Sequence, residues 1–341
     1  MTAPLRYAVI GAGGIAQSYA QVFALTADAK AVVVVDEVRE RGDAFAERLG
    51  CRSLLSYTDV DVSTIDAVLV CTPPITHFEI CSHFIAAGIP VLCEKPLAID
   101  TSSAEALVSA AETAGVTFTM AAKFRYCADV IRAKSIVASG ILGEIMLFEN
   151  VFASRVSMGT RWNADPAISG GGVIIDNGTH SVDIVRYFLG PVADVMAVEG
   201  KRVQGLPVED TAQMYIRTVD DVMATVDLSW SIDKEVDSFI SIYGSQGTVR
   251  VGWKESKYRQ VSSPDWVVFG TGYDKLQAMG DQLANFTAAV RGDEKLLISG
   301  EDAIASVSVI ERAYCSLART DWVAVTGDGS ALPQDSGELV G

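Results

Sequence analysis

The stretch YAVIGAGGIA, residues 7–16, decides the fold of this chain. A short apolar run, typical of a buried strand, leads directly into the pattern G-x-G-x-x-A formed by Gly11, Gly13 and Ala16. The first glycine permits a tight turn, the second lets a bound group approach the backbone, and the small third residue lets a helix pack closely on the strand. Apolar residues then recur with helical spacing, so the stretch predicts a strand, a turn and a helix in succession.

The same alternation continues to about residue 122. Strand patterns follow at residues 30–37, 65–74, 89–96 and 116–124, and helical patterns separate them at residues 39–50, 76–88 and 101–115. We expect Gly50 and Gly88 to close two of these helices, and a Ser or Thr to be the N-cap of the helix at 101–115. This alternation predicts an α/β domain over residues 1–122, built on a doubly wound parallel sheet of the Rossmann type.

The pattern changes after residue 123, where strands follow one another directly. Strands are predicted at residues 144–156, 193–200, 210–220, 222–231, 236–244 and 248–253, with GSQG at 244–247 as a hairpin turn. Helices are predicted at residues 127–140, 171–189, 274–292 and 301–319. We therefore expect a C-terminal α+β domain over residues 123–325, with an open, largely antiparallel sheet and helices on one face. Residues 326–341 contain few apolar side chains and are expected to form a tail.

Composition argues against several classes of protein. The formal net charge of −16 disfavours nucleic acid and anionic membranes as partners, because phosphate recognition needs clustered Lys and Arg. We interpret this charge chiefly as a source of solubility. No apolar run reaches the ~18 residues that span a bilayer, and the first residues lack the features of a signal peptide. Six scattered cysteines without a CxxC motif favour a reducing, cytoplasmic location.

The glycine pattern is followed by an acidic residue at the spacing expected of a dinucleotide site. Asp36 ends the next predicted strand, where a carboxylate accepts hydrogen bonds from the adenosine ribose. The phosphates would lie on the helix N-terminus; a plain tight turn is the alternative interpretation. Glu37 would repel a 2′-phosphate and Arg39 is the first arginine to follow, so we expect NAD rather than NADP. The residues assigned to the cofactor here are Gly11, Gly13, Gly14, Ile15 and Asp36.

Three further motifs follow: CTPPITH at residues 71–77, EKP at 94–96 and GGGVIIDNGTHSVDI at 170–184. With these motifs in this order, the chain resembles the Gfo/Idh/MocA family of sugar and cyclitol oxidoreductases over residues 5–320. The resemblance implies a Rossmann domain followed by a second domain built on an open sheet, in agreement with the patterns above. The chain departs from many relatives at Ala128, where they carry Pro, which leaves the local geometry there open.

The EKP motif ends a predicted strand, at the sheet edge where doubly wound folds bind ligands. At this edge the Lys95 ammonium could stabilise charge on oxygen as an alcohol becomes a carbonyl. The resemblance implies that Lys95 is catalytic; a surface lysine at a strand end is the alternative. Glu94 and Lys95 are also assigned to the cofactor site, and the resemblance adds Thr72, Pro73 and His77. His77 alternatively caps the following helix.

Asp176 and His180 are four residues apart and share a helix face, with Asp183 near the same face. An imidazole titrates near neutrality, which suits His180 to take a hydroxyl proton, while Asp176 would orient the substrate. The resemblance implies that Lys95, Asp176 and His180 form the catalytic group; a satisfied helix histidine beside a solvated acid is the alternative. The glycines at 170–172 suggest close approach to a ligand. No third His or Cys stands nearby, so we expect no metal.

Further substrate contacts are predicted around this group. Lys123 occupies a position where the family often has Asn or another substrate contact. Trp162 could stack on a sugar face, although a core tryptophan is an equal alternative. The predicted substrate residues are Lys123, Trp162, Asp176, His180 and Asp183.

The leading hypothesis is an NAD-dependent oxidoreductase. It would transfer hydride between nicotinamide C4 and a secondary hydroxyl of a sugar, amino sugar, cyclitol or glycosylated compound. The acidic surface slightly favours an amino sugar over a sugar phosphate. Two alternatives remain open: an NAD-dependent glycosidase that acts by transient oxidation and elimination, and a non-catalytic dinucleotide-binding sugar sensor. An open sheet usually needs covering, so we expect a homodimer or homotetramer.

Overall fold

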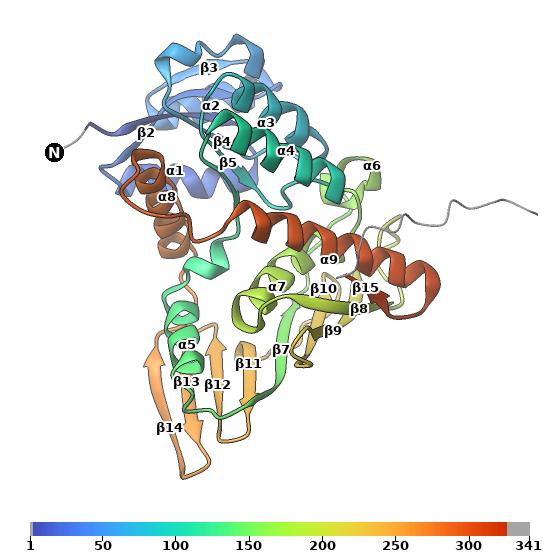
Figure 1. The fold of residues 1–341 in the computed structure, drawn as a ribbon. Coiled ribbons are helices and arrows are strands. Elements are labelled where there is room, and N and C mark those ends of the chain that lie inside the picture. Colours follow the sequence, from blue (N-terminus) through green and yellow to red (C-terminus); the bar gives the residue numbers. More distant parts are fainter. Residues whose placement is uncertain (1–2, 326–341) are drawn as a thin grey trace, which may run out of the picture.

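The first sheet has six parallel strands in the order β3-β2-β1-β4-β5-β6, which is the order of a Rossmann fold (Figure 1). The computed structural model describes residues 3–325, so the predicted tail at 326–341 lies outside the described residues. The strands are β1 (Leu5–Ile10), β2 (Ala29–Val35), β3 (Arg52–Leu54), β4 (Ala67–Val70), β5 (Val91–Glu94) and β6 (Phe118–Ala121). The predicted doubly wound sheet is confirmed, and β3 is the one strand in it that the sequence pattern did not reveal.

Helices cover both faces of this sheet. Those that follow its strands are α1 (Gly14–Leu25), α2 (Arg39–Leu49), α3 (His77–Ala86) and α4 (Thr101–Ala114). Residues of α1 and α2 belong to one apolar core, and residues of α3 and α4 belong to the core on the opposite face. The predicted N-cap of α4 was wrong: the chain enters through Asp100 in an extended conformation, and its carboxylate accepts the backbone N–H of Ser103 at 2.8 Å.

The second sheet has nine strands in the order β14-β13-β12-β11-β7-β10-β9-β8-β15. Within this sheet, β7 and β10 are the only described strands that pair in parallel, so the prediction of a largely antiparallel sheet is confirmed. β11 and β12 are joined by the predicted tight turn at Ser245 and Gln246. The strands are β7 (Ile145–Ala153), β8 (Val192–Glu199), β9 (Thr211–Thr218), β10 (Met223–Ser229), β11 (Ser238–Gly244), β12 (Gly247–Gly252), β13 (Ser256–Gln260), β14 (Ser263–Gly270) and β15 (Val323–Ala324).

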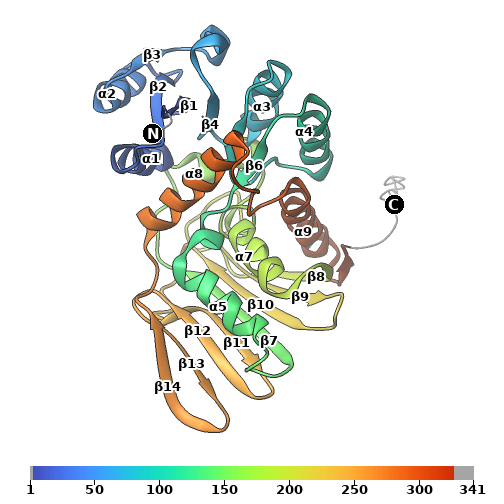
Figure 2. The same ribbon diagram turned by 60° about the vertical axis from the view of Figure 1, so that its left-hand side comes forward.

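Helices pack on one face of the second sheet only. They are α5 (Ala128–Ala138), α7 (Val173–Leu189) and α9 (Gly300–Arg319), and a short helix, α6 (Pro166–Ser169), precedes α7. Figure 2 shows α5 and α7 in front of the sheet, and α9 packs against β8. Along β9 the residues facing the helices are buried, whereas Gln213 and Arg217 on the other face are exposed.

The last two long helices return to the first sheet. α8 (Lys275–Arg291) places Met279, Leu283 and Phe286 in the core beside α1, and Thr287 bonds the hydroxyl of Tyr7 at 2.8 Å. α9 runs across the junction between the two sheets and contributes to the core beneath α3 and α4 (Figure 1). The segment that the sequence assigned to the second domain therefore contributes to both cores. No helix within residues 3–325 is long and apolar enough to cross a bilayer.

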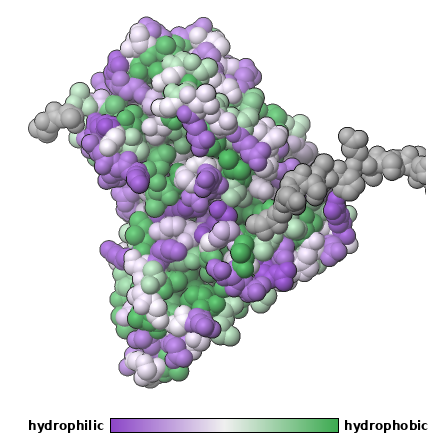
Figure 3. All heavy atoms as spheres, in the orientation of Figure 1, coloured by the Kyte–Doolittle hydropathy of each residue, from purple (hydrophilic) through white to green (hydrophobic). Residues whose placement is uncertain are grey.

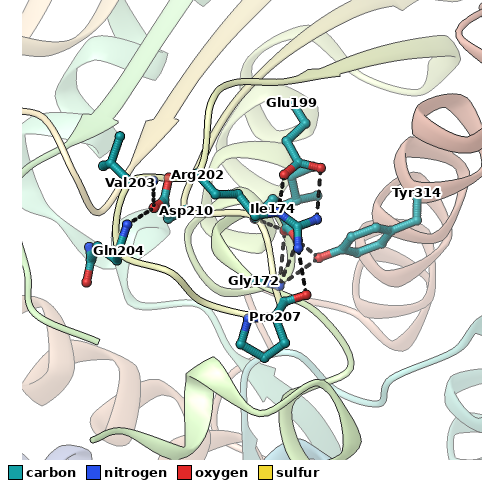
Figure 4. A network of polar contacts seen from close by, with 10 residues as sticks. Gly172, Ile174, Glu199, Arg202, Val203, Gln204, Pro207, Asp210 and Tyr314 are labelled. Atoms are coloured by element: carbon teal, nitrogen blue, oxygen red, sulfur yellow. Dashed lines mark hydrogen bonds and ion pairs between the residues drawn. The ribbon is translucent and has the colours of Figure 1, made fainter. Parts of the chain in front are cut away.

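The N-terminus of α7 is closed by a carboxylate from a distant part of the chain. Glu209 accepts the backbone N–H groups of Gly172 and Ile174 at 3.0 Å and the hydroxyl of Tyr314 at 2.8 Å (Figure 4). A Cβ on Gly171 would collide with the Tyr314 hydroxyl, and one on Gly172 with the backbone oxygen of Glu209. The interpretation of these glycines as a point of ligand approach is therefore corrected: the groups that approach them are the protein's own.

Asp210, which follows Glu209 in the chain, stabilises the loop before β9. Asp210 accepts the backbone N–H groups of Val203 and Gln204 at 2.9 and 3.0 Å, and Arg202 pairs with Glu199 across the same loop (Figure 4). Glu209 and Asp210 thus stabilise two different segments, which places the start of α7 firmly against the loop before β9.

We predict that Gly172→Ala lowers the free energy of unfolding by about 1–3 kcal/mol, because the backbone oxygen of Glu209 cannot move aside without breaking the cap. Gly280→Ala is the matched control: it lies inside α8, a Cβ there meets no atom within 4 Å, and it should be neutral or stabilising by about 0.5–1 kcal/mol. Urea denaturation of the two variants and the parent measures both effects, and equal stabilities would contradict this account of the glycine.

Candidate active site

The turn after β1 has the shape that the glycine pattern predicts. Gly11 has a φ of +94°, and a Cβ on it would lie 2.9 Å from the backbone of Cys71 at the end of β4. Around Gly13 and Gly14, by contrast, a Cβ would meet no protein atom within 4 Å, and no side chain caps the start of α1. Ile15 in the first turn of α1 is partly exposed. The free N–H groups of α1 therefore face open space, as a pyrophosphate needs.

Asp36 closes the neighbouring strand β2. Its two carboxylate oxygens accept the backbone N–H groups of Ala12 and Val38, each at 2.9 Å, and only 6% of the residue is exposed. Arg41 also reaches it, with a guanidinium nitrogen 3.6 Å from Oδ1. The expectation of NAD rather than NADP took account of Arg39 alone, since Arg41 comes close to Asp36 only through the first turn of α2.

His77 joins the CTPPITH and EKP loops. Its buried ring lies between two carbonyl oxygens, with Nδ1 2.8 Å from that of Pro96 and Nε2 2.9 Å from that of Thr72, and the neutral ring donates to one of them at a time. The peptide bond between Lys95 and Pro96 is cis. His77 begins α3, but its side chain does not cap that helix, so the capping alternative is wrong and the ring instead holds two loops together. Thr72 and Pro73 are partly exposed beside it. The assignment of this loop to the cofactor stays a prediction.

Glu94 lies at the end of β5 and is 8% exposed. Its carboxylate accepts the hydroxyl of Tyr19 at 3.1 Å and the backbone N–H of Lys95 at 3.2 Å, and Gln282 in α8 bonds the same hydroxyl. Burial raises the pKa of Glu94, while Lys123 and Lys95 oppose that rise. Glu94 and the Tyr19 hydroxyl therefore connect β5 with α1 and α8.

The predicted catalytic residues converge above Glu94. The Nζ of Lys95 lies 2.6 Å from Oδ1 of Asp176 and donates to the carbonyl oxygen of the same residue at 2.8 Å. One turn along α7, Nε2 of His180 lies 3.0 Å from Nζ of Lys123. Lys123 belongs to η4 (Lys123–Tyr126), a short 3₁₀ segment that directly follows β6. The structure thus gathers Lys95, Lys123, Asp176 and His180 from both halves of the chain.

Burial and the two lysines determine the charge of this group. The pKa of His180 is lowered well below its ordinary value, first by burial and then by Lys123 and Lys95, so the ring is neutral at pH 7. Burial also lowers the pKa of Lys123 to about 8, although Glu94 opposes it. A third lysine, Lys275 at the start of α8, bonds the hydroxyl of Ser18 at 2.8 Å, and no sequence pattern pointed to it.

One predicted substrate residue, Asp183, lies deeper in α7 than the group just described. Asp183 is two helical turns beyond Asp176, about 10 Å along α7, and is 1% exposed. It pairs with Arg125 at 2.9 Å, and Arg125 also pairs with Asp302 of α9 at 2.9 Å. Burial raises the pKa of Asp183 to about 6, which Arg125 opposes. The assignment of Asp183 to the substrate is therefore corrected to a structural ion pair.

Trp162 lies on η5 (Trp162–Ala164) and is 41% exposed, so it is not a core tryptophan. The helix that follows it, α6, contacts η3 (Pro74–Thr76) in the loop that carries Thr72 and Pro73. Its contact with a substrate stays a prediction.

Comparison with known proteins agrees with this geometry. The family model described as "Oxidoreductase family, NAD-binding Rossmann fold" matches residues 5–122, and the "GFO/IDH/MocA C-terminal domain" matches residues 130–250. Inositol 2-dehydrogenase of Rhizobium meliloti (strain 1021) is 24% identical over 341 residues, covering 94% of this chain and 99% of its own.

Solved structures share the fold over nearly the whole chain. GenD2 from gentamicin A biosynthesis, solved in complex with NAD, superposes with a TM-score of 0.86 at 27% identity, covering 96% of this chain and 98% of its own. Levoglucosan dehydrogenase, solved with NADH and levoglucosan, superposes with a TM-score of 0.88 at 20% identity, covering 95% and 100%, and shows the shared fold. The chain therefore belongs to the Gfo/Idh/MocA family of NAD-binding oxidoreductases, of the sugar and cyclitol dehydrogenase type.

Proposed function

We propose that this protein transfers hydride between NAD and a secondary hydroxyl of a polyhydroxylated small molecule, with Lys95, Asp176 and His180 as the catalytic group. The observation that carries the proposal is the convergence of the Lys95–Asp176 ion pair and a neutral His180 at the carboxyl edge of the first sheet. NAD, when bound, accepts the hydride at nicotinamide C4. The chain's own task is to orient the alcohol, take its proton and stabilise its oxygen.

Each member of the group has a distinct part in this reaction. The Lys95 ammonium stabilises negative charge on the substrate oxygen while the carbonyl forms. Asp176 holds that ammonium in place through both its carboxylate and its backbone oxygen. His180 is uncharged, so it can accept the hydroxyl proton. A non-catalytic sensor has no need of this combination, and a glycosidase that acts by transient oxidation would use the same residues but form no net NADH.

Local charge bears on the substrate class. Lys95 faces Asp176 and Lys123 faces Glu94, while Lys275 adds a third ammonium near Lys123. Below about pH 8, where Lys123 is protonated, a cationic ligand would meet this excess of positive charge, so the site favours neutral sugars, cyclitols and glycosides over amino sugars, in spite of the acidic surface. Net NADH formation with a panel of these four compound classes identifies the substrate and separates dehydrogenase from glycosidase.

We predict that Lys95→Met lowers kcat by about 10²–10³ while NAD affinity changes little, because the lost ammonium acts on the substrate oxygen. The matched control is Lys134→Met, which removes a lysine of α5 that bonds the Phe188 carbonyl away from the site. Steady-state kinetics and NAD titration measure the two effects. Full activity of Lys95→Met would remove this residue from the mechanism.

We predict tighter binding of NAD than of NADP, because the Asp36 carboxylate at the end of β2 would accept ribose hydroxyls and repel a 2′-phosphate. Asp36→Asn should weaken NAD binding about tenfold and bring the dissociation constants of NAD and NADP closer together. Arg41→Gln, which removes the neighbouring cation, should weaken only NADP. Calorimetric titration of both dinucleotides decides the matter, and a parent protein that prefers NADP would contradict the assignment.

We also propose that two copies associate through the open face of the second sheet. Val198 and Met223 on this face are 46% and 48% exposed, and Tyr215 lies between their strands. Figure 3 shows one side of the molecule, where hydrophobic and hydrophilic residues are interspersed, and the proposed interface rests on the exposed residues just named and not on that view. We expect light scattering to give the mass of a dimer or tetramer. The double variant Val198→Asp/Met223→Asp should have a lower mass, closer to that of a monomer, and should still bind NAD. A strictly monomeric parent protein would refute this proposal.

A further inference from the structure

The atom of His180 that would take the substrate proton already has a partner. Nε2 lies 3.0 Å from Nζ of Lys123, while Nδ1 is buried and has no hydrogen-bond partner among the described residues. Only 7% of His180 is exposed, whereas Lys123 is partly exposed. A hydroxyl that enters the site therefore meets the lysine at least as readily as the ring.

Packing enforces this contact. The ring of Phe124 stands edge-on to that of His180, with centroids 5.0 Å apart. Arg125, two residues after Lys123, pairs with Asp183, three residues after His180, at 2.9 Å within the protein interior. Two parallel contacts therefore hold η4 against α7, and the separation of Lys123 from His180 follows from the way these segments pack.

The charges around Lys123 are unbalanced. The groups that face it are Glu94 at the end of β5, Lys95 beyond it, Asp176 and His180 on α7, and Lys275 at the start of α8. Two carboxylates thus oppose three ammonium groups. Lys95 is bonded directly to Asp176 and Lys275 is exposed, whereas the burial of Lys123 lowers its pKa and favours loss of its proton.

We propose that Lys123 is a further catalytic residue: its amine receives the proton of the substrate hydroxyl while the His180 ring orients that amine. The proposal rests on the function proposed above and refines the part of His180 in it. The neutral amine donates one N–H to Nε2 and turns its lone pair toward the hydroxyl.

The step balances in atoms and electrons. The substrate C–H bond breaks and both electrons leave as hydride to oxidised NAD. The O–H bond breaks, a C=O bond forms, and the proton becomes the third N–H of the Lys123 ammonium. A protonated His180 would instead add a buried cation beside two lysines, which the lowered pKa of its ring opposes.

The first test follows protonation directly and needs no substrate. The chain has three histidines, so ¹⁵N spectra of the NAD-saturated protein resolve each ring, with His83→Gln to assist assignment. We expect His180 to stay neutral between pH 6 and 9 with its proton on Nδ1, and the ¹³Cε signal of Lys123, assigned by its loss in Lys123→Arg, to titrate near pH 8. A His180 that titrates as an ordinary histidine, or that carries its proton on Nε2, overturns the proposal, as does a Lys123 that stays charged above pH 10.

The second test uses turnover once a substrate oxidised by the parent is in hand. For the parent, kcat/KM should rise with pH through about 8 and then level off, because only the neutral amine accepts a proton. Lys123→Arg keeps the charge and the contact with His180 but cannot lose its proton, so kcat/KM should fall about 100-fold or more and lose that ionisation. An arginine variant that binds NAD and keeps its activity would show that Lys123 serves only as a charge.

Lys134→Met provides the matched control, and its profile should follow that of the parent. Should no compound be oxidised, the spectroscopic titration still decides the state of Lys123, so failure of this inference is distinguishable from failure of the proposed function.

Discussion

The ion pair between Lys95 and Asp176 is the contact on which the site depends, because it joins the two sheets at one point. Lys95 follows β5 of the first sheet, and Asp176 lies in the first turn of α7, which covers the second. A carboxylate oxygen at 2.6 Å and a backbone oxygen at 2.8 Å hold the same ammonium. Such a charge-assisted and partly buried arrangement is more strongly directional than a surface ion pair.

Other contacts of the C-terminal half hold α7 in the position that brings Asp176 to Lys95. Glu209 closes the N-terminus of the helix, and Tyr314 of α9 bonds the same carboxylate. Further along, Arg125 joins Asp183 of α7 to Asp302 of α9. α9 also packs on the first sheet, so one helix stabilises both the position of α7 and the junction that α7 faces.

Burial gives His180 and Lys123 protonation behaviour that the same side chains would not have in water. Burial keeps His180 neutral and lowers the pKa of Lys123 to about 8, while Lys95 is paired with the Asp176 carboxylate beside them. The proposed reaction uses this difference, since the Lys95 ammonium would stabilise charge on the substrate oxygen while an uncharged group beside it would accept the proton. The same burial gives Asp183, deeper in the helix, a purely structural part.

Sequence alone determined what local patterns encode: the Rossmann alternation, the glycine turn, the strand-end position of Lys95 and the helical spacing of Asp176 and His180. It missed β13, whose polar and charged residues hide the alternation of a strand, and it missed β14 and the very short strands β3 and β15. It also placed the glycines at 170–172 against a ligand, whereas Glu209 and Tyr314 approach Gly171 and Gly172. Only the tertiary structure decided those contacts that join distant segments. The approach of Lys123 to His180, of Arg41 to Asp36 and of α8 to the first sheet depends on how helices pack, and packing is set by the whole core, which no short stretch of sequence contains.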